Sequence, residues 1–188
     1  MAKLVTADFS NNANPCIMCY ITIDNQMIDL KVDSFDAEII SHIYANGEIQ
    51  LIFNKPITFI GDFAFSNCTT LKSIRIPNSV TSIGRSAFVN CSCLESITIP
   101  DNVTNIGDSA FSSCRKLTSI TIGNNVASIG NGVFCYCSNL QTIICKAIQP
   151  PSLGTSNFSD IPQDAIVIVP KGFENLYMSS DWKILFEQ

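Results

Sequence analysis

Residues 80–102 read VTSIGRSAFVNCSCLESITIPDN, and residues 103–125 read VTNIGDSAFSSCRKLTSITIGNN. The same pattern begins at residues 57 and 126, so four consecutive copies follow one another with a 23-residue period. A fixed period of about 20–29 residues containing L-x-x-I-x-I is typical of a leucine-rich solenoid, in which each repeat forms one coil of a stack. Six columns recur from copy to copy, and in residues 80–102 they are Ile83, Gly84, Phe88, Cys91, Leu94 and Ile97.

Each copy divides into three parts. The L-x-x-I-x-I segment alternates buried and exposed positions, which predicts a short parallel β-strand. The V-T-x-I-G segment predicts a second short strand on the opposite side of the coil, with the glycine adopting a backbone angle that other residues resist. The residues around each Ala-Phe pair are too few for more than about one helical turn. We expect a continuous aromatic column inside the stack, made of Phe65, Phe88, Phe111 and Phe134.

The segment before the repeats is predicted to form a loose arm and a β cap. Residues 1–15 are rich in Asn and lack apolar periodicity, whereas residues 16–56 contain short apolar runs separated by turn signals. Leu51 and Phe53 lie one 23-residue period before Ile74 and Ile76, so their strand is expected to be in register with the array. Strands are predicted at 17–23, 27–32, 38–44 and 48–53, with tight turns at Asp24-Asn25 and Asn46-Gly47.

The pattern weakens after the fourth copy. We therefore interpret residues 57–148 as four regular repeats, and residues 149–188 as a degenerate fifth repeat with a C-terminal cap, all in one domain. Leu153-Gly154, Phe158 and Val167–Val169 repeat the earlier columns with one inserted residue. A short amphipathic helix and tail are expected to cover the last coil, because a bare sheet edge invites association with other chains. Their apolar residues are Phe173, Leu176, Tyr177, Trp182, Leu185 and Phe186.

Composition argues against two classes of partner. The formal net charge is −5 and Lys and Arg are not clustered, whereas binding to nucleic acid needs a concentrated basic patch. No stretch approaches the roughly 20 apolar residues of a membrane span, so membrane insertion is not expected. Residues 1–15 also lack the apolar run of a secretory signal, which leaves a cytosolic location, a removed signal and another export route open.

The nine cysteines are predicted to be free thiols rather than a disulfide framework. Stacked coils lie roughly 4.8 Å apart. Identical cysteines in neighbouring coils would then be too far apart for the Cβ separation of about 3.8 Å that a disulfide requires. Buried thiols behave as small apolar side chains. The repeated column comprises Cys68, Cys91, Cys114 and Cys137, while Cys93 and Cys135 fall in variable positions where partial exposure is expected.

No residue pattern supports catalysis, a cofactor or a metal. Cys16-x-x-Cys19 has the spacing of half a zinc site, but a second ligand pair is missing and the surrounding sequence resembles a strand. His42 is the only histidine and is interpreted as a packing residue of the cap, which leaves no catalytic triad. Asp62, Asp101 and Asp108 occupy turns of different copies, so the sequence predicts no paired carboxylates.

The remaining functional candidate is the exposed face of the predicted main sheet. In each L-x-x-I-x-I segment the Leu and both Ile point inward, so the intervening residues point outward and align across neighbouring strands. These rows contain no aromatic residue, which favours weak or multivalent contact over a tight hot spot. The same residues are also compatible with a merely solvated face. The candidate residues are Lys72, Arg75, Glu95, Thr98, Thr118, Thr121, Gln141 and Ile144.

The copy V-T-x-I-G-x-x-A-F-x-x-C-x-x-L-x-x-I-x-I-P resembles the BspA-like, or treponemal-type, leucine-rich repeat, most closely over residues 57–145. The segments at 48–53 and 150–172 resemble the caps of such arrays. The resemblance implies a right-handed leucine-rich solenoid with a parallel β-sheet along one side. Members of the family are generally regarded as surface or secreted adhesion proteins of bacteria and parasitic protists. The family motif defines the scaffold columns and no shared binding residue.

Three functional hypotheses follow. The first is a non-enzymatic interaction or adhesion module that binds a host or cell-surface protein, acting as a monomer or weak oligomer, with a surface or secreted location implied by the resemblance. The second is a structural or scaffolding segment of an envelope or cytosolic assembly. The third is a thiol or metal-binding protein, which the cysteine pattern favours least.

Overall fold

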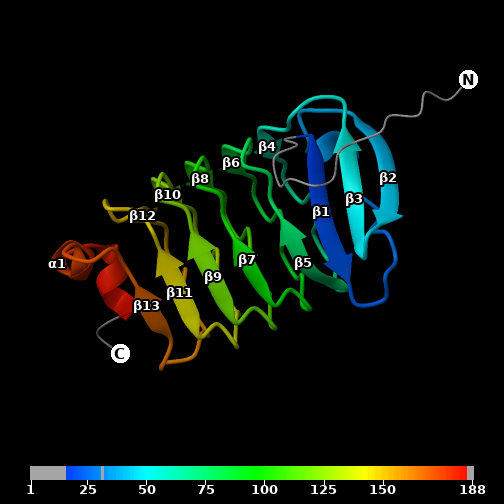
Figure 1. The fold of residues 1–188 in the computed structure, drawn as a ribbon. Helices are drawn as coiled ribbons and strands as arrows, with labels where there is room; N and C mark the ends of the chain where they lie inside the picture. Colours follow the sequence, from blue (N-terminus) through cyan, green and yellow to red (C-terminus); the bar gives the residue numbers. More distant parts are fainter. Residues whose placement is uncertain (1–15, 31, 186–188) are drawn as a thin grey trace, which may run out of the picture.

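The computed structural model describes residues 16–30 and 32–185, which form a stack of coils with additional structure at both ends (Figure 1). Each coil contributes one strand to a main sheet and a two-residue strand to a back sheet. The back strands are β4 (Phe59–Ile60), β6 (Ser82–Ile83), β8 (Asn105–Ile106), β10 (Ser128–Ile129) and β12 (Ser152–Leu153). The main strands of the coils are β5 (Leu71–Arg75), β7 (Ser96–Thr98), β9 (Ser119–Ile122), β11 (Thr142–Cys145) and β13 (Ile166–Ile168).

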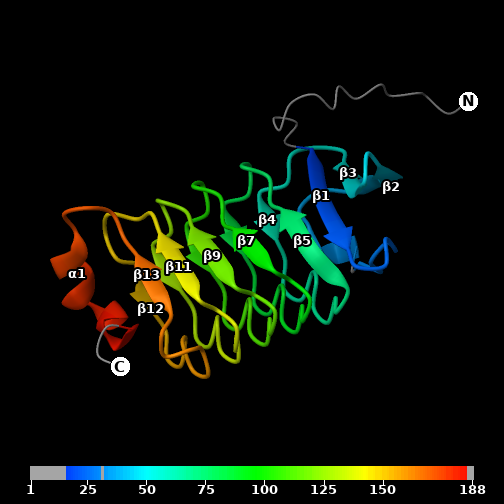
Figure 2. The same ribbon diagram turned by 60° about the horizontal axis from the view of Figure 1, so that its bottom comes forward.

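Successive coils stack with the 23-residue register expected from the sequence. Ile97 pairs with Ile120 in the main sheet, and Ile83 pairs with Ile106 in the back sheet, both in parallel strands. Two parallel sheets therefore run along opposite sides of the stack, with the apolar columns buried between them (Figure 2). The predicted leucine-rich solenoid is confirmed.

The phenylalanine column forms the predicted aromatic core. The rings of Phe88 and Phe111 lie 5.1 Å apart with an interplanar angle of 4°, and both side chains are fully buried. Phe158 of the fifth coil extends the column at 5.8 Å from Phe134. At the other end, Phe35 of the cap meets Phe65 edge-on, so that the cap closes the column.

The repeated glycine has a different role from the one we expected. Of the described glycines, only Gly47, Gly132 and Gly172 have positive φ, and none belongs to the repeated column. A Cβ atom added to Gly107 would lie 2.6 Å from the backbone nitrogen of Arg85 in the preceding coil. Glycine is therefore required because the backbones of neighbouring coils approach closely, whereas its conformational freedom is not used.

Two tight turns replace the predicted helical turn. Between the back and main strands the described coils contain turns and no assigned helix. In the third coil Ser109 and Ser113 adopt left-handed φ angles of 55° and 61°. Left-handed residues four positions apart interrupt a right-handed helix, so this segment forms turns instead of a helical turn.

The N-terminal cap is built from three antiparallel strands: β1 (Ile17–Thr22), β2 (Ile39–Ala45) and β3 (Glu48–Phe53). The Asn46-Gly47 hairpin is confirmed, with Ala45 paired to Glu48 and positive φ at both turn residues. The predicted strand at 27–32 is wrong. Residues 27–30 are irregular, and Val32–Ser34 form a short 3-10 helix, η1. The backbone N–H of Ile28 donates to the Tyr20 hydroxyl, so this segment is held by a side chain instead of a strand partner.

The expected register of β3 with the array is also wrong. Strand β1 lies between β3 and β5 and pairs antiparallel with both. Tyr20 of β1 pairs with Ile49 of β3 on one side and with Ile74 of β5 on the other. Ile49 and Ile74 are therefore separated in the sequence by more than one repeat period. The backbone N–H of Glu95 in the next coil donates to the carbonyl of Lys72, which continues the main sheet from β5 towards β7.

The last coil has a longer period than the others and is followed by two short helices. Ile166 pairs with Thr142 in parallel, and this offset exceeds the regular repeat period by the one inserted residue that the sequence predicted. Helix α1 (Glu174–Met178) and the 3-10 helix η2 (Asp181–Leu185) follow. Tyr177 and Trp182 are fully buried, and the Trp182 indole N–H donates to the carbonyl of Pro151. The arm at 1–15 and Phe186 lie outside the described residues.

Candidate interaction surface

The cysteine column forms part of the core. Cys91, Cys114 and Cys137 are buried free thiols, whereas Cys68 is half-buried. Each buried thiol donates to the carbonyl of a phenylalanine in the preceding coil, as Cys114 does to Phe88 at 3.2 Å. Burial raises the pKa of the Cys137 thiol to about 12. A thiol with such a pKa stays protonated at neutral pH and is a poor nucleophile and metal ligand.

The other candidate chemical groups are also engaged in the scaffold. The Tyr20 hydroxyl and Nε2 of His42 form a hydrogen bond, and burial lowers the pKa of this histidine. Cys16 and Cys19 are not joined to one another by a disulfide. Among residues 16–30 and 32–185, no three His, Cys, Asp or Glu side chains come close enough to bind a metal ion.

The turn aspartates connect neighbouring coils. The Asp62 carboxylate accepts the backbone N–H of Arg85, and that of Asp108 accepts the backbone N–H of Asn131, each at 2.7 Å. Both residues directly follow the repeated glycine, so the carboxylate of one coil binds the backbone of the next. Sequence reasoning placed these residues in turns and missed this role, because a single copy does not show the neighbouring coil.

One predicted row of outward residues is straight across four coils. Backbone N–H groups of Glu95, Thr118 and Gln141 each donate to the carbonyl of the preceding row member, beginning at Lys72. All four residues are exposed. The Lys72 ammonium lies 3.9 Å from the Glu95 carboxylate, and exposed pairs of this kind contribute about 0–1 kcal/mol. The row therefore presents charge at one end and neutral polar groups at the other.

The second predicted row is longer than the sequence indicated. Thr98 pairs with Thr121, and Thr121 pairs with Ile144, as expected. Ile168 of the fifth coil continues the row beyond Ile144. In the other direction Arg75 is opposite Cys19 of β1, and Cys19 is opposite Gln50 of β3. The inserted strand β1 places these buried cap residues in line with the row, and no signal in the 23-residue pattern could have located them.

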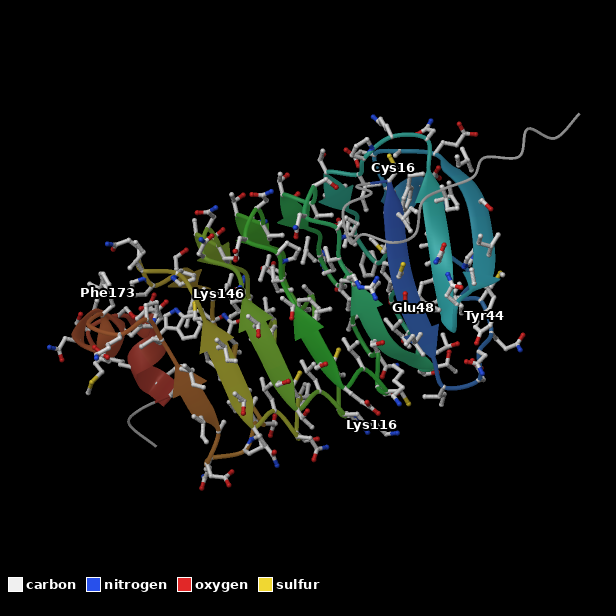
Figure 3. The ribbon with its side chains drawn as sticks, in the orientation of Figure 1. Cys16, Tyr44, Glu48, Lys116, Lys146 and Phe173 are labelled. Atoms are coloured by element: carbon white, nitrogen blue, oxygen red, sulfur yellow. The ribbon has the colours of Figure 1, made fainter. Side chains whose placement is uncertain are left out.

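The cap end of this surface carries an ion pair between Arg75 and Glu48 and a buried polar residue, Gln50. The Arg75 guanidinium lies 2.6 Å from the Glu48 carboxylate, so the pair spans β1. Figure 3 shows Glu48 beside this strand. Burial and the nearby Glu48 carboxylate raise the pKa of the Cys19 thiol, while Arg75 acts in the opposite direction. Gln50 is only 4% exposed, and among the described residues its Oε1 has no hydrogen-bond partner.

The opposite end of the surface is apolar. Ile166 and Ile168 are 60% and 47% exposed. The same columns contain Ser119 and Thr121 in the third coil. The outer face thus changes from an ion pair at the cap, through hydroxyl groups, to isoleucines at the last coil. Within the described chain, no helix is long and apolar enough to cross a membrane.

Comparisons with known proteins identify the repeat. Residues 37–163 match the BspA type leucine rich repeat region in six copies. No curated protein matches the chain.

Three solved structures are similar to the chain. A leucine rich repeat protein of T. pallidum is 26% identical, with a TM-score of 0.47, and the match covers 65% of this chain and 50% of that one. A leucine rich cell surface protein from Faecalibacterium prausnitzii is 26% identical, with a TM-score of 0.38 and coverage of 70% and 46%. A leucine-rich repeat protein from Bacteroides ovatus is 22% identical, with a TM-score of 0.32 and coverage of 69% and 46%. The chain spans about half the length of these proteins.

Leucine-rich repeat proteins generally serve as protein-interaction modules. The predicted resemblance is confirmed by the extent of the family match, which covers more than half of the sequence. The chain belongs to the BspA type leucine-rich repeat family.

Proposed function

We propose that the chain is a non-enzymatic adhesion module whose main-sheet outer face binds a protein displayed on a cell surface. The observation that supports this proposal is the alignment of outward residues from consecutive coils into two rows on one face. A surface assembled from several coils can contact a partner over an extended area, which is the usual way in which solenoids bind.

The chemistry of the face indicates the kind of contact. Thr98 and Thr121 offer hydroxyl groups on neighbouring strands, while the ion pair of Arg75 with Glu48 offers charge at one end. The rows lack the aromatic anchors that dominate tight interfaces. We therefore expect modest affinity for a single chain, increased by multivalent display on either surface.

A solid-phase binding assay tests the proposal. Purified chain is titrated onto immobilised extracellular matrix proteins and onto intact host cells, and bound chain is measured. The variant Thr98→Lys/Thr121→Lys places two long cations in the centre of the outer face. Both positions point outward, so this variant is expected to retain its fold and to lose most of the binding.

A matched variant on the back of the coil provides the control. Thr81 and Thr104 are exposed threonines beside the back strands of two consecutive coils, and their hydroxyls contact only backbone carbonyls of the preceding coil. Thr81→Lys/Thr104→Lys adds the same charge and is expected to bind normally. Equal loss from both variants would contradict an outer-face site. Failure of the unmodified chain to bind any matrix protein or cell type would contradict adhesion.

A further inference from the structure

Two Asn-Gly dipeptides occur in the chain, and the structure places them in different surroundings. Asn46-Gly47 forms the hairpin turn between β2 and β3, in the cap at the end of the molecule opposite α1 (Figure 1). Asn131-Gly132 lies in the fourth coil, directly after the back strand β10. Asn-Gly is more prone to spontaneous deamidation than other asparagine pairs, because glycine has no side chain to obstruct its own backbone nitrogen. That nitrogen attacks the asparagine side chain, so the reaction requires both groups to be free.

Asn131-Gly132 is held by hydrogen bonds at both reacting groups. The backbone N–H of Gly132 donates to the carbonyl of Thr155 at 2.8 Å. The Asn131 side chain donates to the Asp108 carboxylate at 3.2 Å, and its Oδ1 accepts the backbone N–H of Thr155 at 2.9 Å. These bonds join the fourth coil to the coils on either side of it. Ring closure at Asn131 would therefore have to break contacts with both neighbouring coils.

Asn46-Gly47 lacks such contacts. Both residues are exposed, and within the described part of the chain neither the Asn46 side chain nor the Gly47 backbone N–H has a hydrogen-bond partner. A Cβ atom added to Gly47 would meet nothing within 4 Å, so there is open space around the turn. The nucleophile and the amide that it would attack are thus both available.

A left-handed backbone does not by itself distinguish Asn46. Asn25, Asn67 and Asn90 also have positive φ, between 55° and 60°. After each of these three, the backbone N–H of the next residue donates a hydrogen bond. The bonds are Gln26 to the Asp24 carboxylate, Cys68 to the Phe65 carbonyl and Cys91 to the Phe88 carbonyl. Among residues 16–30 and 32–185, Asn46 is therefore the one left-handed asparagine that is followed by an unbonded N–H.

We propose that Asn46 is a site of spontaneous deamidation, whereas the hydrogen bonds around Asn131 protect that residue. The backbone nitrogen of Gly47 loses its proton and attacks Cγ of Asn46. The new C–N bond closes a succinimide ring, and the side-chain amide nitrogen leaves as ammonia. Water then opens one of the two ring carbonyls, which gives aspartate or isoaspartate. Water is the only co-reactant, and no group is oxidised or reduced.

Both products change the cap. A neutral amide becomes a carboxylate, in a chain whose formal net charge is already −5. Isoaspartate also routes the main chain through the former side chain, which lengthens a turn that consists of two residues between Ala45 and Glu48. Glu48 forms the ion pair with Arg75, so the new negative charge lies two residues from that pair in the sequence. Deamidation depends on the chain's own groups and on no binding partner.

Incubation of the folded chain in mildly alkaline buffer tests the proposal. Ion-exchange chromatography follows the acidic forms, and peptide mapping by mass spectrometry locates the modified asparagine and separates aspartate from isoaspartate. We expect Asn46 to convert at least about tenfold faster than Asn131, because each hydrogen bond that must break before ring closure slows the reaction by up to about tenfold. In concentrated urea, where the fold no longer protects Asn131, the two rates should become similar.

A pair of turn variants provides a second readout. Asn46→Gly removes the reacting amide and keeps a residue that readily adopts positive φ, so it should eliminate the main acidic form of the folded chain. The matched control Asn25→Gly changes another exposed, left-handed asparagine, whose following N–H is bonded to Asp24. This control should leave the acidic form and its rate of formation unchanged. Circular dichroism verifies that both variants fold.

Three results would overturn the proposal. In the folded chain, Asn131 could convert as fast as Asn46, or neither residue could convert faster than the other asparagines. The difference between the two sites could persist undiminished in urea, which would show that local sequence and not the fold determines it. The acidic form could also survive in Asn46→Gly or disappear in Asn25→Gly, which would place the reaction at another residue.

Discussion

The thiol of Cys114 donates a hydrogen bond to the carbonyl of Phe88 in the preceding coil, at 3.2 Å. The same bond links Cys137 to Phe111 and Cys91 to Phe65. Each cysteine thus fills the core and gives a second donor to a carbonyl that already accepts a backbone N–H, as the Phe88 carbonyl does from Cys91. A small polarizable donor at this position therefore links neighbouring coils as well as filling the core.

We predict that Cys91, Cys114 and Cys137 resist alkylation in the native chain. All three are fully buried, and burial raises their thiol pKa. Timed labelling with iodoacetamide and peptide mass mapping should show modification of the half-buried Cys93 and Cys135 first, with all nine thiols reacting after unfolding. Prompt labelling of native Cys114 would contradict its position in the core.

Phe111→Ala should lower the free energy of unfolding by about 3–5 kcal/mol, because it removes a ring from the middle of the buried column. Urea denaturation followed by circular dichroism measures the change. Tyr44→Ala in the cap serves as the control, since Tyr44 is 52% exposed and its loss should cost much less. Equal costs for both variants would place Phe111 outside the core.

Gly107→Ala should be more destabilising than Gly132→Ala. A methyl group on Gly107 would overlap the backbone of the preceding coil, which we expect to cost about 3 kcal/mol. At Gly132 a methyl group has room, its closest neighbour being 3.7 Å away, so only the left-handed φ of 59° costs energy, about 1 kcal/mol. The opposite ranking in thermal melts would show that conformation, and not close coil packing, selects the repeated glycine.

The cap should lose stability as pH falls below the ordinary His42 pKa of 6.5. Burial lowers the His42 pKa in the folded chain, so the unfolded chain binds the proton more readily within this window. The folded state is then fully stable above pH 6.5, loses stability as pH falls through that value, and stops losing it below the lowered pKa. His42→Gln keeps an acceptor for Tyr20 and should flatten the profile in chemical denaturation. An unchanged profile would show that His42 does not contribute.

The stacked coils could be predicted from the sequence because each of their columns is read from the same local pattern. Phe88, Cys91 and Ile97 recur at a fixed spacing. Because each coil has the same length, equivalent residues of successive coils stack on one another. The outward positions of Thr98 and Thr121 follow from the same alternation. The polar rows of the candidate surface could therefore be predicted from the sequence alone.

The cap and the glycine column required three-dimensional information. The insertion of β1 beside β5 is a long-range pairing that no local pattern records, so the position of Cys19 and Gln50 in line with Arg75 was missed. The role of Gly107 depends on the backbone of another coil. The sequence singled out Cys19 and Gly107 and could not state what they contact.

Nuclear Overhauser spectroscopy of the aromatic rings tests the stacking on which the proposed binding face depends. In the described structure the ring centroids of Phe65 and Phe88 lie 5.0 Å apart, and those of Phe88 and Phe111 lie 5.1 Å apart. We predict direct ring-to-ring cross-peaks between each phenylalanine of the column and its equivalent in the next repeat. Absence of these cross-peaks in a folded sample would contradict coils stacked in register, and with them the straight rows of the outer face.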